Sequence, residues 1–126
     1  MKFLLDTCAL IWWTLDQAKL PAATLDTLNE GEILLSSISI WEVGIKIKNK
    51  KLDIGLPLEV YVKKLKEISM LEILPVTEEI WLKNIELPWD HKDPADRTIV
   101  ATAALSNCFI VTTDHLIKNF YPKIFW

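Results

Sequence analysis

The sequence predicts an α/β protein in which helices cover both faces of a short parallel β-sheet. Two observations carry this prediction. Short apolar runs alternate along the chain with longer runs of helical periodicity, an order typical of parallel sheets. The short runs also lack the apolar–polar alternation of a half-exposed strand, so the strands are expected to be buried on both sides.

The length of the chain, 126 residues, suits one domain. A chain of this size can bury a hydrophobic core without disulfides or a structural metal. With 51% hydrophobic residues and only three glycines, it contains no tract with the composition of a linker or a disordered segment. We therefore expect a single domain over residues 1–126.

The predicted elements begin with a strand and follow one another in a regular order. Apolar runs of strand length are expected to form the sheet, at residues 2–6, 32–37, 71–76 and 108–114, with a brief last strand at 123–126. Longer runs predict helices at residues 7–17, 21–31, 37–50, 58–69, 77–87, 94–105 and 115–120. Each strand but the last is thus followed by at least one helix.

Residues that favour helix ends support these boundaries. Thr7 and Thr77 are predicted N-caps, and Pro21 and Gly31 mark the beginning and the end of the second helix. The helix at 77–87 is amphipathic, and its apolar side carries Ile80, Trp81 and Ile85. In a surface helix such a side faces the core.

Composition and the N-terminal sequence exclude several classes of protein. The opening residues MKFLLD reach a charge after three apolar residues, and no later run approaches the ~18 residues of a membrane span, so we expect a cytoplasmic protein without membrane contact. Cys8 and Cys108 form no CxxC motif, and two reduced thiols with buried packing roles are expected.

The overall charge does not indicate a nucleic-acid-binding protein. The net charge is -3, so any such binding must be local. One segment concentrates positive charge, at Lys46, Lys48, Lys50 and Lys51. These lysines either form the solvated end of a helix, where the dipole favours cations, or contact phosphate groups.

Two acids occupy the expected carboxyl ends of two predicted strands. Asp6 comes after the apolar run of the first strand, and Asp114 ends the strand at 108–114. In parallel sheets ligands bind outside the carboxyl ends of the strands, so both acids are candidate site residues. Each also has a simpler interpretation, because Asp6 could shape a turn and Asp114 could cap the helix that follows.

Glu42 belongs to a narrow polar stripe on an otherwise apolar helix. Ser39, Glu42 and Lys46 recur at helical spacing within residues 37–50. An exposed helix usually has a wider polar face, so a stripe that faces a cleft explains the pattern better. The alternative is a solvent face on which Glu42 and Lys46 form an ion pair.

The stretch HKDPADR, residues 91–97, sets two acids at a helix start. Pro94 suits the first helical position, which makes Asp93 the predicted N-cap. Asp96 then shares a face with Ile99 and is expected to point towards the sheet, whereas Arg97 points outward.

Convergence of Asp6, Glu42, Asp96 and Asp114 would have an electrostatic cost. Two ionised carboxylates about 5 Å apart repel by roughly 3 kcal/mol at an effective dielectric near 20. Either some of the acids bind protons, or a hard divalent cation neutralises them. Oxygen ligands suit Mg2+ or Mn2+ better than zinc, since the two cysteines and two histidines have no zinc-site spacing.

The segments FLLDT, SSISIWEVGIK, DPADRTIVATA and IVTTD, in this order, resemble the PIN-domain nucleases, and most closely the VapC-type toxins of toxin–antitoxin pairs. The resemblance runs from Asp6 to Asp114. It implies a PIN-like three-layer α/β/α sandwich and a metal-dependent endoribonuclease that uses Mg2+ or Mn2+. The family's four acids fall on Asp6, Glu42, Asp96 and Asp114, the last being the most variable position in the family.

The resemblance also implies supporting residues. Thr7 and Ser39 match hydroxyl positions beside the acids. Asp93 belongs to the DPxDR form of the third motif, and the resemblance does not say whether Asp93 contacts the metal. An acidic pocket would repel RNA unless cations invert the local field, which gives Lys46 and Lys48 an expected role as phosphate contacts.

Partners follow from the same resemblance. A VapC-type toxin implies an RNA substrate, a homodimer, and a cognate antitoxin whose apolar segment covers a groove near the site. Trp12, Trp13 and Trp89 are expected contact points for that segment. The alternative is a catalytically silent PIN-like module that only binds RNA or protein, which retention of all four acids disfavours.

Overall fold

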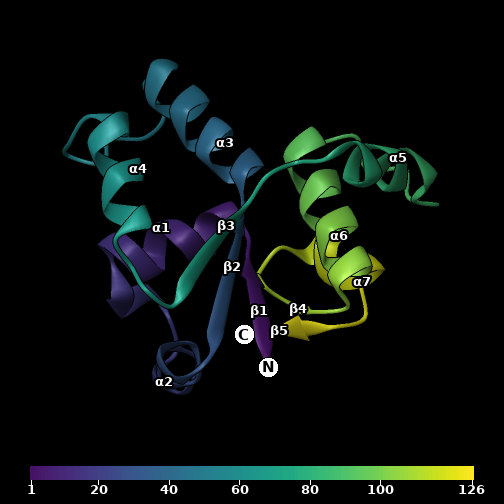
Figure 1. Ribbon diagram of the computed structural model, residues 1–126, viewed down its shortest axis with the longest axis horizontal. Coiled ribbons are helices and arrows are strands. Elements are labelled where there is room, and N and C mark those ends of the chain that lie inside the picture. Colours follow the sequence, from purple (N-terminus) through teal and green to yellow (C-terminus); the bar gives the residue numbers. More distant parts are fainter.

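The computed structural model describes the whole chain, residues 1–126 (Figure 1). The strands are β1 (Lys2–Leu5), β2 (Glu32–Ser36), β3 (Leu71–Leu74), β4 (Phe109–Val111) and β5 (Ile124–Phe125). The helices are α1 (Thr7–Leu15), α2 (Ala22–Glu30), α3 (Ser37–Lys48), α4 (Leu58–Lys66), α5 (Glu78–Glu86), α6 (Pro94–Ser106) and α7 (His115–Phe120), with a short 3-10 helix at Gln17–Lys19. No helix combines the length and the hydropathy that a membrane span requires.

The five strands form one parallel sheet in the order β3-β2-β1-β4-β5. Leu4 of β1 pairs with Leu34 of β2 on one side and with Ile110 of β4 on the other, so β1 is the central strand. Leu4 and Leu5 are both fully buried although they point to opposite faces. The predicted α/β class and its short parallel sheet are therefore confirmed.

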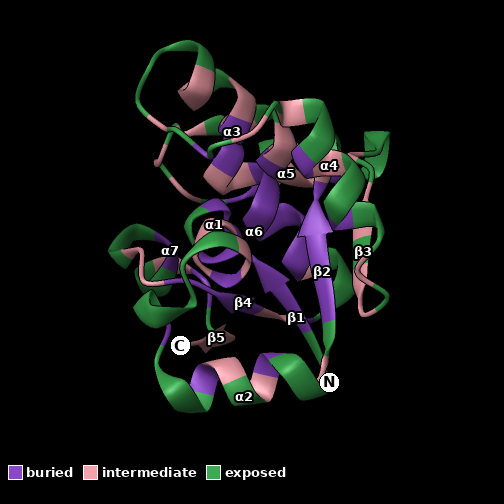
Figure 2. Cartoon of the chain, turned by 90° about the vertical axis from the view of Figure 1, so that its left-hand side faces the viewer, coloured by how far each residue is buried: buried purple, intermediate pink, exposed green.

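Helices cover the sheet on both faces, and each face has its own apolar core. On one face Phe3 and Leu5 pack with buried side chains of α1, α2, α3 and α4. On the other face Leu4 and Leu34 pack with α5, α6 and α7. Figure 1 shows these two groups of helices on opposite sides of the strands, and in Figure 2 the strands β1, β2 and β4 are mainly buried. The arrangement is a three-layer α/β/α sandwich.

Two predictions about helices were wrong. Asp6, not Thr7, is the N-cap of α1, because its Oδ1 accepts a hydrogen bond from the Ala9 amide at 2.8 Å. The apolar side of α5 is not buried as expected, since Ile80 is 8% exposed but Trp81 and Ile85 are 44% and 77% exposed. α5 lies on the outer side of α6, so only the part of its surface that faces α6 meets the core.

Candidate functional site

The topology brings the strand-end acids together. From β1 the chain adds strands on one side through β2 and β3, and on the other through β4 and β5. The carboxyl ends of β1 and β4 thus lie side by side at the point where the strand order reverses, which is where open α/β sheets bind ligands. Asp6 follows β1 directly, and Asp114 lies three residues beyond the end of β4.

A pocket of about 210 Å³ opens at this edge of the sheet. It is lined by nine residues from four segments of the chain: Asp6, Thr7, Cys8, Glu42, Lys46, Asp93, Asp96, Thr113 and Asp114. Five of them carry carboxyl groups and one carries a positive charge. The four acids that sequence analysis singled out line one pocket, and Asp93 is the fifth.

Asp6 is the most deeply buried of these acids, at 7% exposure. Its Oδ1 accepts the Ala9 amide hydrogen bond, and its Oδ2 accepts a hydrogen bond from the Thr112 hydroxyl. Desolvation by burial raises the pKa of Asp6 to about 6, these two hydrogen bonds lower it, and the nearby charges of Asp96 and Asp114 raise it further. The carboxylate at the centre of the site is therefore costly to ionise.

Thr112 is a site residue that sequence reasoning missed. Its hydroxyl donates to Asp6 Oδ2 and accepts a hydrogen bond from the Asp114 amide at 3.0 Å. It thus connects the acids at the ends of β1 and β4. The only signal in the sequence was a threonine two residues before Asp114, and this does not predict a contact with Asp6, 106 positions away.

Thr7 and Ser39 connect the two helices that carry Asp6 and Glu42. The Thr7 hydroxyl donates to Ser39 Oγ at 3.0 Å, and both residues are buried. Thr7 lines the pocket, whereas Ser39 does not. This hydrogen bond fixes the start of α1 against the first turn of α3. Glu42, farther along α3, reaches the pocket.

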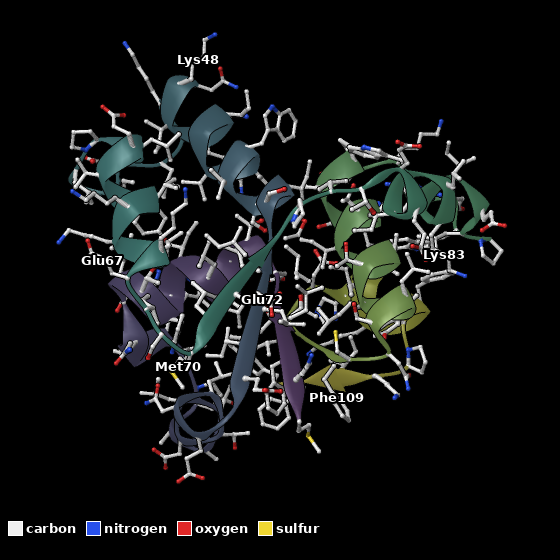
Figure 3. The ribbon with its side chains drawn as sticks, in the orientation of Figure 1. Lys48, Glu67, Met70, Glu72, Lys83 and Phe109 are labelled. Carbon is white, nitrogen blue, oxygen red and sulfur yellow. The ribbon has the colours of Figure 1, made fainter.

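The polar stripe on α3 faces the pocket through Glu42 and Lys46. The one ion pair between a lysine and a carboxylate is Lys19–Asp16, so Glu42 and Lys46 do not pair. Both side chains are half-buried and line the pocket. Lys48 does not line it and is exposed at the far end of α3 (Figure 3).

Asp93 and Asp96 have different hydrogen bonds, as the helix-start pattern predicted. Asp93 is the N-cap of α6, and its Oδ1 accepts from the Asp96 amide at 2.8 Å. The Asp96 carboxylate lines the pocket, and its Oδ2 lies 2.8 Å from Nε2 of His91. Burial is the largest cause that raises the pKa of Asp96, while the hydrogen bond with His91 lowers it.

Asp114 combines the two interpretations that the sequence left open. Its Oδ1 accepts hydrogen bonds from the amides of Leu116 and Ile117, at 2.8 and 3.1 Å, so it caps α7. The same side chain lines the acidic pocket. The cap holds the carboxylate at the edge of the pocket.

Arg97 does not point outward as expected. Its guanidinium donates to the backbone carbonyls of Trp89 at 2.6 Å and His91 at 3.0 Å, and to Asn84 Oδ1 at 3.1 Å. Helical periodicity placed it on the side of α6 away from the sheet, but the segment between α5 and α6 runs over that side. Arg97 therefore anchors the segment that precedes Asp93.

Cys8 also departs from its expected role. Both cysteines are free thiols, but only Cys108 is buried, whereas Cys8 is exposed and lines the pocket. Burial raises the pKa of the Cys8 thiol, and the charge of Asp6 raises it further. The thiol thus stays protonated at neutral pH and adds no charge to the acidic pocket.

The donor set of the pocket suits a hard divalent cation. Its charged donors are carboxylate oxygens, and the destabilised ionised form of Asp6 would be relieved by a nearby cation. No three carboxylate, thiol or imidazole groups are gathered tightly enough to hold an ion by themselves. That arrangement fits Mg2+, which keeps several waters and takes one or two protein carboxylates.

Comparison with protein families agrees with this geometry. The model of the PIN domain matches residues 3–121. The chain belongs to the PIN-domain family. The matched range includes every residue that lines the acidic pocket of this PIN domain.

Individual relatives share the length of the chain but few of its residues. Ribonuclease VapC22 of Mycobacterium tuberculosis (strain ATCC 25618 / H37Rv) is 25% identical over 118 residues, which cover 92% of this PIN domain and 89% of the relative. DNA-bound VapBC from Salmonella typhimurium includes a chain with a TM-score of 0.70 and 21% identity, over 98% of this chain and 95% of that one. VapBC2 from Rickettsia felis, bound to a promoter DNA fragment, includes a chain with a TM-score of 0.68 and 19% identity, over 98% of this chain and 96% of that one. The PIN domain thus has the fold of these chains.

Proposed function

We propose that this chain is a metal-dependent endoribonuclease, the toxin of a toxin–antitoxin pair, formed by one PIN domain over residues 1–126 and acting in the cytoplasm. The observation that carries the proposal is the acidic pocket, where five carboxyl groups converge at the switch point of the sheet beside a single lysine. Similarity to a ribonuclease across nearly the whole chain supports the same activity.

Asp6 and Asp96 are the proposed direct ligands of the metal ion, and Asp114 and Glu42 are proposed to contact it through its bound water molecules. A bound Mg2+ or Mn2+ ion would polarise the scissile phosphate and supply a nucleophilic water at neutral pH. The protein contributes the fixed positions of the carboxylates. Thr112 and the Ala9 amide hold Asp6, the α7 cap holds Asp114, and the start of α6 holds Asp96.

Binding of RNA requires positive charge next to these acids. Lys46 is the cation that lines the pocket, so it is the proposed contact to a phosphate beside the scissile one. Lys48 lies outside the pocket and is proposed to contact phosphates farther along the RNA strand. The net charge of -3 makes such local contacts necessary.

The antitoxin is the proposed protein partner, because the similar solved structures are described as VapBC assemblies. A second groove, of about 510 Å³, offers an apolar surface for such a partner between α1 and α4. Trp13, Tyr61 and Leu65 line it. Of the three tryptophans that we expected at this contact, Trp13 lines the groove, Trp12 packs on Trp126, and Trp89 stacks on Phe120.

A homodimer is likewise proposed. Apolar side chains of α5 and α6 stay exposed around a shallow surface pocket, namely Leu82, Ile85 and Leu105. They offer a surface for a second copy of the chain.

Purified protein is expected to cut an internally labelled RNA in the presence of Mg2+ or Mn2+ and to be inactive in EDTA. Glu42→Gln should lower the cleavage rate by roughly 10²-fold or more, the scale of a general acid–base or water-orienting group. The measurement is a time course of fragment formation on a gel. A protein that binds RNA but never cleaves it, with either ion, would support the silent-module alternative.

A further inference from the structure

The imidazole of His91 directly contacts one of the proposed metal ligands. Its Nε2 lies 2.8 Å from Asp96 Oδ2, with both side chains about four-fifths buried, at 19% and 21% exposure. His91 does not line the acidic pocket, whereas Asp96 does. The imidazole therefore contacts the Asp96 carboxylate without being part of the pocket wall.

The position of the ring is set by contacts that do not involve Asp96. The ring packs on Trp89, with centroids 4.9 Å apart, and Trp89 stacks on Phe120 at 4.7 Å with an interplanar angle of 7°. The backbone on either side is held by Arg97, which donates to the carbonyls of Trp89 and His91. The hydrogen-bonding nitrogen is thus presented to Asp96 from a fixed support.

We propose that His91 is a positioning residue, whose Nε2–H donates to Asp96 Oδ2 and holds the carboxylate in the orientation that leaves Oδ1 for a divalent cation. The proposal rests on the metal-dependent function proposed above. An ionised carboxylate can only accept, so the imidazole must be the donor. Asp96 Oδ1 accepts no hydrogen bond within the protein, which leaves its lone pairs available.

The alternative is that His91 only fills space between Trp89 and Asp96. Two variants separate these roles. His91→Gln keeps an N–H donor at the end of the side chain but loses the ring, whereas His91→Phe keeps the ring that packs on Trp89 but loses the donor. A positioning role predicts that glutamine rescues function and phenylalanine does not, and a packing role predicts the reverse order.

Binding of Mn2+, followed by electron paramagnetic resonance, is the readout that does not depend on activity. His91→Phe is expected to weaken Mn2+ binding about tenfold or more, the usual effect of losing a partner of a metal ligand. It should lower kcat for RNA cleavage by a similar factor, with KM for RNA and the melting temperature nearly unchanged. His91→Gln should stay within about threefold of the wild type in Mn2+ affinity.

The proposal would be overturned if the wild type did not bind Mn2+ or if His91→Phe bound it as tightly as the wild type. It would also be overturned if His91→Gln bound Mn2+ as weakly as His91→Phe. If the wild type binds Mn2+ but cleaves no RNA, the proposed function fails while the affinities still decide the role of His91. Nitrogen-15 spectra of the wild type give a check that needs no variant. The proposal expects a proton on Nε2 of His91, and an unprotonated Nε2 would contradict it.

Discussion

Asp6→Asn is expected to abolish RNA cleavage and at the same time to make the fold more stable. Cleavage should fall by roughly 10³-fold or more, the scale seen when one member of a catalytic unit is removed. The gain in stability follows from burial. Desolvation raises the pKa of Asp6 from 3.8 to about 6, so the folded protein holds a proton that the unfolded chain has already lost.

The sign of the pH dependence follows from this shift. Below about pH 4 Asp6 is protonated in both the folded and the unfolded state, so it does not lower the free energy of unfolding. Between about pH 4 and pH 6 only the unfolded chain loses the proton, so the free energy of unfolding falls, by about 3 kcal/mol at pH 7. Asparagine carries no charge and escapes this loss, although its amide must repair the hydrogen bond with Thr112 at a cost of about 1 kcal/mol.

Urea denaturation in EDTA measures the prediction. At pH 8 Asp6→Asn should be more stable than the wild type by about 1–2 kcal/mol, and at pH 4 this advantage should disappear. Asp26→Asn, the same change at an exposed position of α2, should change neither cleavage nor stability by more than about 0.5 kcal/mol. An Asp6→Asn protein that is less stable than the wild type at pH 8 would show that ionised Asp6 is not strained.

Mg2+ is expected to stabilise the wild type and to lose this effect in Asp96→Asn. An ion that binds only the folded state at 100 times its dissociation constant adds about 2.7 kcal/mol. For a domain of this size that corresponds to a rise of several degrees in melting temperature. The Asp96 carboxylate lines the pocket and, with its charge removed, contributes far less to cation binding.

Differential scanning calorimetry with and without millimolar Mg2+ gives the shift for each variant. Asp93→Asn is the matched comparison, because asparagine is an equally good N-cap and the change lies three residues away in the same pocket. It should retain most of the shift, and Asp96→Asn should retain little. Equal shifts in the wild type and Asp96→Asn would place the bound ion elsewhere.

Local signals in the sequence predicted most of the fold and the convergence of the acids. Continuous apolar runs mark strands with two buried faces, and acids close to the carboxyl ends of two such runs lie near each other if the strands are parallel neighbours. The helix start at Asp93 and Pro94 depends only on cap chemistry, which aims Asp96 correctly. These inferences need no knowledge of distant contacts.

Tertiary contacts decided what the sequence could not predict. Thr112 and Asp6 meet across 106 positions, and nothing local to either residue names the other. Arg97 is enclosed by the irregular segment between α5 and α6. The sequence could not predict this, because that segment has no periodicity that indicates its path. The exposure of the apolar side of α5 could not be predicted for a similar reason, since a helical pattern shows which side is apolar but not whether another element covers it.

The location of a bound Mn2+ ion tests the central claim most directly. Anomalous diffraction from crystals soaked in Mn2+ should show a peak in the acidic pocket, in contact with carboxylate oxygens of Asp6 and Asp96, and the peak should be lost in Asp6→Asn. No peak in the pocket, or one that survives unchanged in Asp6→Asn, would contradict a metal-dependent nuclease site at this edge of the sheet.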